Sequence, residues 1–153
     1  MLVVWRMTTA KHVDAALSGE GARLYGGRWN PKGVPMVYTA ESQSLATLEL
    51  LVQDGRLLAN YAMIPVNLPS RMKIERLDPK DLAADWWKPE SREQTQLIGA
   101  DWCRRGSSAV LAVPSAVIQS EINYLLNPLH PSFSKIVIGE AQEFMTDMRL
   151  PRK

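Results

Sequence analysis

Glycine is unevenly distributed along this chain, and its clustering restricts the fold more than any other feature. Five of the nine glycines lie within 15 residues, at Gly19, Gly21, Gly26, Gly27 and Gly33. Glycine adopts backbone conformations that other residues avoid, and it lets another group approach the main chain closely. We therefore predict that residues 19–33 form an irregular loop or a tight hairpin.

Short apolar segments around this stretch alternate irregularly between strand and helix patterns. β-Branched and aromatic runs predict strands over residues 2–5, 34–39, 61–68, 72–77, 109–113, 135–138 and 144–150. Capping residues and helical spacing predict helices over residues 11–17, 42–54 and 91–103, and a short helix that starts at 78–79. Residues 123–131 contain two X-Pro steps, which predict a structured loop. This order favours an α+β fold, and a length of 153 residues predicts a single domain over 1–153.

Composition excludes several classes of protein. Eighteen Lys and Arg against sixteen Asp and Glu leave a formal charge of +2, too balanced for non-specific binding to nucleic acid or a membrane surface. The single cysteine, Cys103, excludes an intrachain disulfide and fits a reducing compartment. No apolar run reaches the ~18 residues of a membrane span, and MLVVWRMTT lacks the pattern of a signal peptide. We therefore expect a soluble, cytoplasmic protein.

Glu49 is the most informative acidic residue. In a helix over residues 42–54, Leu45, Leu48 and Val52 form one apolar stripe, and Glu49 falls on the same stripe. Such a carboxylate either reaches water at the edge of the buried face or points into a cavity. A carboxylate on an apolar face beside a glycine-rich loop is a candidate site residue.

Arg28 directly follows two glycines in the segment GGRWN. Backbone N–H groups and an arginine fork can converge there on a phosphate or carboxylate, although an exposed hairpin tip would give the same pattern. The segment matches neither a Walker loop nor a dinucleotide-binding GxGxxG motif. Tyr38, in the following predicted strand, either stacks on a planar ligand or packs in the core.

Other chemistry has weaker support. Ser115, His130 and Glu49 are the residue types of a hydrolase triad, but no GxSxG elbow is present. Two histidines and one cysteine, without metal-ligand spacing, argue against a metal site. Arginine neighbours could lower the pKa of Cys103, but a buried structural thiol is the favoured interpretation.

Several segments taken together resemble the RES-domain family, the toxins of toxin–antitoxin pairs. The matching segments are Trp5-Arg6, then GARLYGGRWNPKGVPMVYTAESQSLATLELL, then LAVPSAVIQSEINYLLNPLHPSF. They cover most of the chain in the order found in the family. GGRWN followed by VYTAES and a helix with LEL is more specific than any one of these pieces.

The resemblance implies a fold similar to that of ADP-ribosyltransferases, with short strands in a split β core flanked by helices. It assigns Arg28, Glu49 and Ser115 to the family's Arg, Glu and Ser, with Ser120 as the second choice for the serine. Arg6 and Tyr38 are expected to line the pocket. Some relatives carry an aromatic residue after the first arginine, where this chain has Met7.

The resemblance also implies a function. We expect a toxin that uses NAD as substrate and needs no metal, and that is neutralised by an Xre-like antitoxin. It would cleave the nicotinamide–ribose bond with water or phosphate as acceptor, while Ser115 orients the nicotinamide amide or a ribose hydroxyl. ADP-ribosyl transfer to a protein is the first alternative, and a non-catalytic binding module is the second. The resemblance leaves open whether the protein forms a homo-oligomer.

Overall fold

The computed structural model describes residues 1–55, 60–145, 147 and 149. Its strands are β1 (Leu2–Thr9), β2 (Val37–Ala40), β3 (Tyr61–Leu68), β4 (Ile74–Arg76), β5 (Val110–Pro114), β6 (Ile122–Leu126), β7 (Val137–Ile138) and β8 (Gln142–Phe144). Its α-helices are α1 (Glu20–Tyr25), α2 (Gln43–Asp54) and α3 (Arg92–Arg105). Short 3₁₀ helices are η1 (Ala10–Ala15), η2 (Pro79–Asp81), η3 (Pro89–Ser91) and η4 (Pro131–Lys135). None of the helices in these residues is long and apolar enough to cross a membrane.

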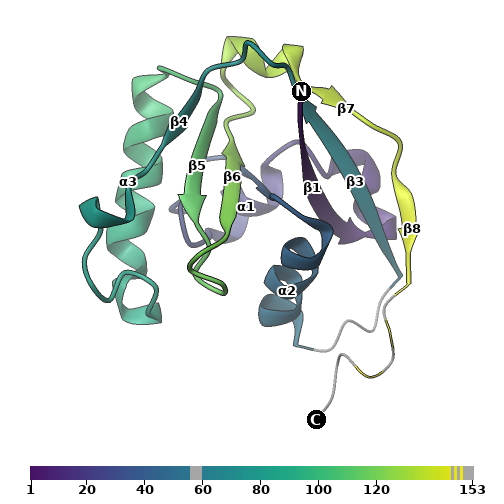
Figure 1. Cartoon of the computed structure of the whole chain (residues 1–153), viewed down its shortest axis with the longest axis horizontal. Coiled ribbons are helices and arrows are strands. Elements are labelled where there is room, and N and C mark those ends of the chain that lie inside the picture. The colour runs from purple at the N-terminus through teal and green to yellow at the C-terminus, as the bar shows by residue number, and fades with distance from the viewer. Residues whose placement is uncertain (56–59, 146, 148, 150–153) are drawn as a thin grey trace.

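The strands form one sheet that consists of two halves. The order is β4-β5-β6-β2-β1-β3-β7, with β8 also paired to β3. β1 and β3 pair along eight residues, from Leu2↔Leu68 to Thr9↔Tyr61. β2 and β1, in contrast, pair only at Trp5↔Ala40, and the two halves diverge on either side of this junction (Figure 1). The expected α+β fold with a split β core is therefore confirmed.

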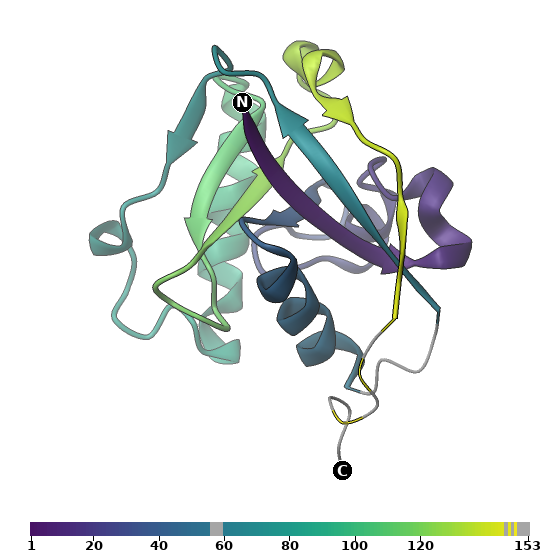
Figure 2. The same cartoon turned by 45° about the vertical axis from the view of Figure 1, so that its right-hand side comes forward.

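Helices cover the two halves differently. α3 packs against the β5–β6 half, where Trp29, Trp86 and Trp102 belong to one buried cluster. α2 lies beneath the junction, as Figures 1 and 2 both show. Leu45 of α2 is fully buried in a second cluster with Met7 of β1 and Ala40 of β2. α2 therefore presents its side chains to both halves of the sheet at once.

The strongest sequence predictions are confirmed. α2 occupies residues 43–54, and Ser42 caps it by accepting a hydrogen bond from the Leu45 N–H at 3.1 Å. β3 covers all of residues 61–68 and continues through Pro65, whose carbonyl accepts a hydrogen bond from Gly139 N–H at 2.8 Å. α3 begins beside Ser91 as predicted, although the side chain of Ser91 makes no capping hydrogen bond.

Several sequence predictions are wrong in part. Residues 20–25 of the glycine-rich stretch form α1, because Gly19 (φ 74°) and Gly26 (φ 75°) provide the left-handed backbone at its two ends. Residues 122–126 form the central strand β6 rather than a loop, since the two X-Pro steps at 128 and 131 follow the strand. Near the C-terminus, β7 covers only 137–138, and β8 covers 142–144 instead of starting at 144. Residues 146, 148 and 150 of the predicted last strand lie outside the described residues.

Candidate active site

Helix α2 carries Glu49 to the junction between the two halves of the sheet. Leu45 and Ala46, one turn before it, are buried, whereas Glu49 is half-buried. Its carboxylate lines a cavity that we name the first cavity. That cavity is lined by Trp5, Arg6, Met7, Tyr38, Thr39, Ala40, Ala46, Glu49, Leu50, Gln53 and Asn123. Of the two positions considered for Glu49, the structure thus has the one that faces a cavity.

Two buried side chains hold the Glu49 carboxylate by a single oxygen. Ser115 Oγ donates to Glu49 Oε1 at 2.7 Å, and Asn123 Nδ2 donates to the same oxygen at 2.6 Å. Hydrogen bonds to an ionised acceptor are short and strong compared with neutral ones. Within the described part of the chain, Oε2 of Glu49 accepts no hydrogen bond. One oxygen is therefore fixed and the other is available to a ligand.

The hydroxyl of Ser115 makes three hydrogen bonds, one as donor and two as acceptor. Its Oγ accepts hydrogen bonds from Val117 N–H at 3.0 Å and Ile118 N–H at 3.1 Å, so its own proton points to Glu49. Ser115 is fully buried, whereas Ser120 is exposed in the turn that precedes β6. The structure thus brings Ser115, and not Ser120, to Glu49.

Sequence reasoning gave no site role to Asn123. Asn123 lies on β6 opposite Ala40 of β2 and Val113 of β5, and only 8% of its surface is exposed. Its Oδ1 is buried and has no hydrogen-bond partner among the described residues. A strand prediction over residues 122–126 would have pointed to Asn123. In a strand between β2 and β5, its side chain has to face either the core or the junction.

Arg6 spans the junction from β1. Its Nε donates to Ala16 O at 3.2 Å, and its Nη1 donates to Tyr38 O at 3.3 Å. Because β1 and β2 pair at one position only, the Arg6 side chain supplies a link that a regular strand ladder would otherwise provide. Burial lowers the pKa of the guanidinium, and the nearby Tyr38 opposes that shift.

Arg6 and Tyr38 also line a second cavity on the other side of the junction. Its walls come from the end of η1, helix α1, the glycines that follow it and the start of α3. The second cavity is lined by Arg6, Ala15, Ala16, Gly19, Glu20, Gly21, Ala22, Tyr25, Gly26, Gly27, Met36, Tyr38, Gln53 and Arg92. The two cavities share Arg6, Tyr38 and Gln53, so they are neighbouring parts of one cleft.

Tyr38 is anchored to the GGRWN segment. Its hydroxyl donates to Asn30 Oδ1 at 2.5 Å and accepts from Trp29 N–H at 3.0 Å. Burial raises the pKa of the phenol above its ordinary value, so Tyr38 stays neutral near neutral pH. A Cβ on Gly27 would lie 2.5 Å from this hydroxyl, which explains why this position requires glycine.

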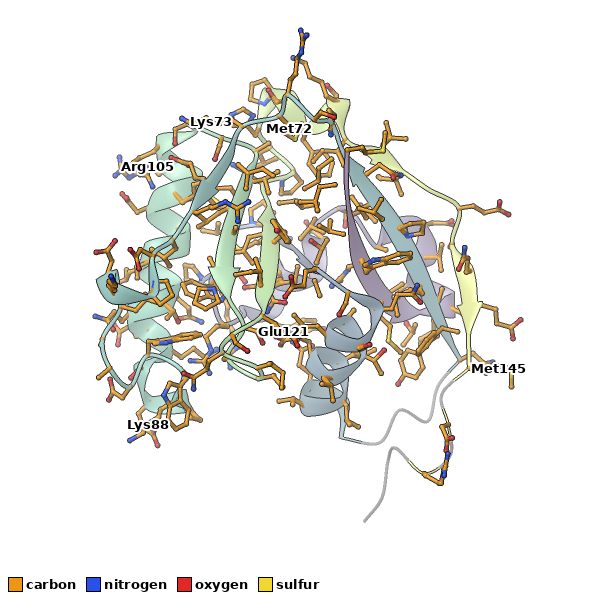
Figure 3. The ribbon with its side chains drawn as sticks, viewed as in Figure 1. Met72, Lys73, Lys88, Arg105, Glu121 and Met145 are labelled. Carbon is orange, nitrogen blue, oxygen red and sulfur yellow. The ribbon has the colours of Figure 1, made fainter. Side chains whose placement is uncertain are left out.

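Arg28 does not contact Glu49. Its Nη1 donates to Trp86 O at 3.1 Å and Lys88 O at 3.0 Å, in the loop that leads to α3. Figure 3 shows Lys88 at the lower end of α3, opposite the end that carries Arg105. Burial and the positive charge of Arg92 lower the pKa of Arg28, while the charge of Glu49 raises it. Arg28 therefore lies in the electrostatic field of the site without lining either cavity.

Helix α3 fixes the backbone of the GGRWN segment. Gln96 Nε2 donates to Gly27 O at 2.8 Å, Arg92 Nε donates to the same carbonyl at 3.2 Å, and Thr95 Oγ1 donates to Arg28 O at 2.6 Å. A Cβ on Gly99 would lie 1.6 Å from Trp29 O, so only glycine permits this close approach. The segment is not a free hairpin tip, and Arg92 is a site residue that sequence reasoning missed.

The remaining sequence hypotheses have clear outcomes. Met7 is buried and lines the first cavity, so a thioether forms this part of the cavity wall. His130 Nδ1 accepts from Ser132 N–H and Nε2 bonds to Gly106 O at 2.9 Å, whereas the Ser115 hydroxyl donates to Glu49. A Ser115–His130–Glu49 triad is therefore absent. No three His, Cys, Asp or Glu side chains in the described residues come together as metal ligands.

The thiol of Cys103 is half-buried on α3. Burial raises its pKa to about 11, so it is protonated at neutral pH. This shift is opposite in direction to the one expected from arginine neighbours, and it agrees with the favoured interpretation of a buried structural thiol.

The sequence of this chain is similar to those of a known protein family. The profile of the RES domain matches residues 3–147. A protein named Toxin Res from Photorhabdus laumondii is 41% identical over 152 residues, which are 97% of each chain. The Prs ADP-ribosylating toxin of a Sphingobium strain is 34% identical over 155 residues, covering 97% of this chain and 96% of its own. The NAD(+) phosphorylase MbcT of Mycobacterium tuberculosis is 33% identical over 110 residues, covering 65% and 58%.

A solved structure has the same fold. The crystal structure of the M. tuberculosis MbcT–MbcA toxin–antitoxin complex contains a chain that superimposes with a TM-score of 0.77. The superposition covers 93% of this chain and 83% of that one, at 21% sequence identity. At this identity the match establishes the fold.

Proposed function

This chain belongs to the RES domain family, and from that membership we propose that it is a toxin that cleaves the nicotinamide–ribose bond of NAD. Relatives named as an NAD(+) phosphorylase and as an ADP-ribosylating toxin support NAD as the substrate. Both activities begin by breaking the same glycosidic bond. They differ in the group that receives the ADP-ribose.

The observation that carries this proposal is the Glu49 carboxylate, held by Oε1 in a cavity with Oε2 unpaired among the described residues. As the bond between nicotinamide and ribose breaks, its electron pair leaves with the nicotinamide, and positive charge develops on the ribose C1′ and ring oxygen. A fixed carboxylate stabilises such a charge without having to reorganise during the reaction. Oε2 can also accept a hydrogen bond from a ribose hydroxyl.

Ser115 and Asn123 have positioning roles in this proposal. Because both donate to Oε1, they keep the carboxylate oriented before NAD arrives. Ser115 is fully buried and its proton is directed to Glu49, so we assign it to Glu49 and not to the nicotinamide amide or a ribose hydroxyl. This assignment revises the role expected for Ser115 from the family resemblance.

Arginines on the other side of the cleft fit the anionic part of NAD. The diphosphate carries two negative charges, and guanidinium groups bind phosphate oxygens through paired, charge-assisted hydrogen bonds. Arg6 lines both cavities, and Arg28, which lines neither, adds positive charge close enough to interact with Glu49. Tyr38, between them, offers the face of a neutral ring to the nicotinamide.

Water or phosphate would complete the reaction. With water, C1′ gains a hydroxyl and one proton is released, which gives ADP-ribose and nicotinamide. With phosphate, a phosphate oxygen forms the new bond to C1′. A protein side chain as acceptor is the second candidate, and the name of the Sphingobium relative favours it.

An antitoxin protein completes the proposed system. The neighbouring fold is that of a toxin solved together with its antitoxin MbcA. We propose that the partner of this chain is an Xre-like antitoxin that covers the NAD cleft, and that both proteins act in the cytoplasm, where NAD is available. The chain would form a single RES domain over residues 1–153.

The test is release of nicotinamide from NAD by the purified protein, with and without phosphate. We expect release by the wild type, loss of release in Glu49→Ala, and slower release at low NAD concentration in Arg28→Ala, with Glu93→Ala on the exposed face of α3 as control. Faster release with phosphate would identify phosphorolysis. If the wild type releases no nicotinamide under either condition, the proposal is wrong; transfer of label from adenine-labelled NAD to protein tests the second candidate.

A further inference from the structure

Arg92 lies at the start of α3 with most of its guanidinium unused. Its Nε donates to Gly27 O at 3.2 Å. Neither Nη1 nor Nη2 has an acceptor among the described residues, and no carboxylate oxygen of these residues lies within 4.0 Å of the guanidinium as an ion-pair partner. An arginine held by Nε alone presents the other four N–H groups as a flat fork.

Arg92 also lies close enough to Arg28 for their like charges to repel. The positive charge of Arg92 is one of the causes that lower the pKa of Arg28, and the described residues provide no carboxylate partner for Arg28 either. Glu49 acts on Arg28 only through its electric field, so neither cation has an ion-pair partner among the described residues, and a doubly charged ligand would offset their repulsion. The pair therefore favours an anion with more than one charge.

The cavity around Arg92 has room for the rest of such a ligand. Arg92 and Arg6 are the cations that line the second cavity, and Arg6 also lines the first cavity beside Glu49. The carboxylate in the lining, Glu20, is already paired with Arg23 through its Oε1. The positive charge of the second cavity is thus not neutralised by its own wall.

We propose that Arg92 binds the diphosphate of the dinucleotide in the second cavity and so determines that the substrate carries an ADP half. This inference rests on the proposed function, because Glu49 in the first cavity orients the nicotinamide riboside half. Arg92 then takes two phosphate oxygens through Nη1 and Nη2 while Gly27 O holds its Nε. Arg6, between the two cavities, lies against the link between the halves.

The roles of charge and of loop support can be separated by substitution. Arg92→Ala removes the charge and one of the two donors to Gly27 O. Gln96→Ala removes the other donor, at 2.8 Å, and keeps the charge. Arg104→Ala removes an exposed arginine of the same helix, which pairs with Asp101. Thermal melting confirms that each variant is folded.

Calorimetric titration with ADP and steady-state kinetics with NAD measure the effect. We expect Arg92→Ala to weaken ADP binding roughly 10-fold or more, since a hydrogen bond to a charged group contributes about 1.5–3 kcal/mol. The KM for NAD rises by a similar factor while kcat changes little, and Arg92→Lys recovers only part of the loss because it keeps the charge but not the fork. Arg104→Ala binds ADP as the wild type does, and Gln96→Ala loses less affinity than Arg92→Ala because it keeps the charge.

Three results would overturn the inference: unchanged ADP binding in Arg92→Ala, an equal loss in Gln96→Ala, or a fall in kcat with unchanged KM. The proposed function fails separately. If the wild type binds ADP through Arg92 but releases no nicotinamide from NAD, the proposed diphosphate site is supported and the proposed reaction is contradicted. If the wild type cleaves NAD and Arg92→Ala does so with the same KM, the proposed reaction is supported and the proposed diphosphate site is contradicted.

Discussion

The two sides of the cleft hold their charged groups in opposite ways. On the side formed by α2 and β6, the Glu49 carboxylate accepts hydrogen bonds of 2.7 and 2.6 Å from buried side chains. On the side formed by the GGRWN segment and α3, Arg28 and Arg92 donate to backbone carbonyls at 3.0–3.2 Å and keep N–H groups free. We refer to these as the acid side and the arginine side.

This difference separates catalysis from binding. A charge that must act in the transition state is most effective when the protein fixes it before the substrate arrives. A charge that binds an anion in the ground state and in the transition state alike lowers KM without raising kcat. We therefore expect substitutions on the acid side to change kcat and substitutions on the arginine side to change KM.

Shortening Glu49 gives the largest expected effect. Glu49→Asp keeps the negative charge but moves the carboxylate by about one bond length away from Ser115 and Asn123, and a misplacement of about 1 Å can cost about 10²-fold in rate. We expect kcat for nicotinamide release to fall by about that factor with KM little changed. Glu93→Asp on the exposed face of α3 is the control, and a Glu49→Asp enzyme with normal kcat would contradict a fixed acid.

Removing the donors to Glu49 comes next. Ser115→Ala and Asn123→Ala each delete one hydrogen bond to the carboxylate, and about 1.5–3 kcal/mol per bond corresponds to a drop in kcat of roughly 10- to 100-fold. Because both bonds end on the same oxygen, the double variant should lose less than the product of the two single losses.

A matched comparison assigns the serine. Ser120→Ala changes an exposed side chain and should leave kcat unaltered. Loss of activity in Ser120→Ala together with normal activity in Ser115→Ala would reverse the assignment.

On the arginine side, Arg28→Ala should act more weakly and on the other parameter. The substitution removes a cation from the field of the site and two bonds to the loop of residues 86–88. We expect KM for NAD to rise roughly 10-fold, as for the loss of one charged hydrogen-bond partner, with kcat within a few-fold of the wild type. A fall in kcat at unchanged KM would show that Arg28 acts in the transition state, as the residues of the acid side do.

The smallest effect is expected at Cys103, which lies on α3 but lines neither cavity. Burial raises the pKa of its thiol to about 11, so the reactive thiolate is scarce at pH 8. Iodoacetamide should alkylate it more slowly than it alkylates a cysteine in an unstructured peptide, and more rapidly as the pH rises toward 11. Cys103→Ser should leave both kcat and KM unchanged; fast alkylation at pH 8 with loss of activity would contradict this.

The sequence contains enough local information to predict much of the acid side. The Ser42 cap, the buried Leu45 and the terminal Gly55 all lie within residues 42–55, so helix α2 could be found without a structure. The predicted apolar stripe is buried at Leu45 but not at its far end, where Val52 is 67% exposed. Apart from the hydrolase triad that the structure lacks, only the family motif connects Ser115 with Glu49 in the sequence, because their contact joins residues 66 positions apart.

Other parts could not be predicted because their causes are distant in the sequence. Asn123 was placed in a loop, since the prolines at 128 and 131 obscured the strand that precedes them. Arg92 has no local signal, and its partner Gly27 is 65 residues away. Helix α1 was not predicted, because the sequence does not distinguish glycines that end a helix from glycines that form a loop.

The single residue pair that joins the two halves of the sheet also bears on synthesis by the ribosome. β1, β2 and Glu49 of α2 emerge early, but Ser115 and Asn123 lie on or next to β5 and β6, and β6 ends at residue 126 of 153. β2 acquires its long partner only when β6 has been made, since its other contact is one pair with β1. A nascent chain therefore cannot hold Glu49 through Ser115 and Asn123 until β6 has left the ribosome, so the proposed activity cannot appear before that point of synthesis.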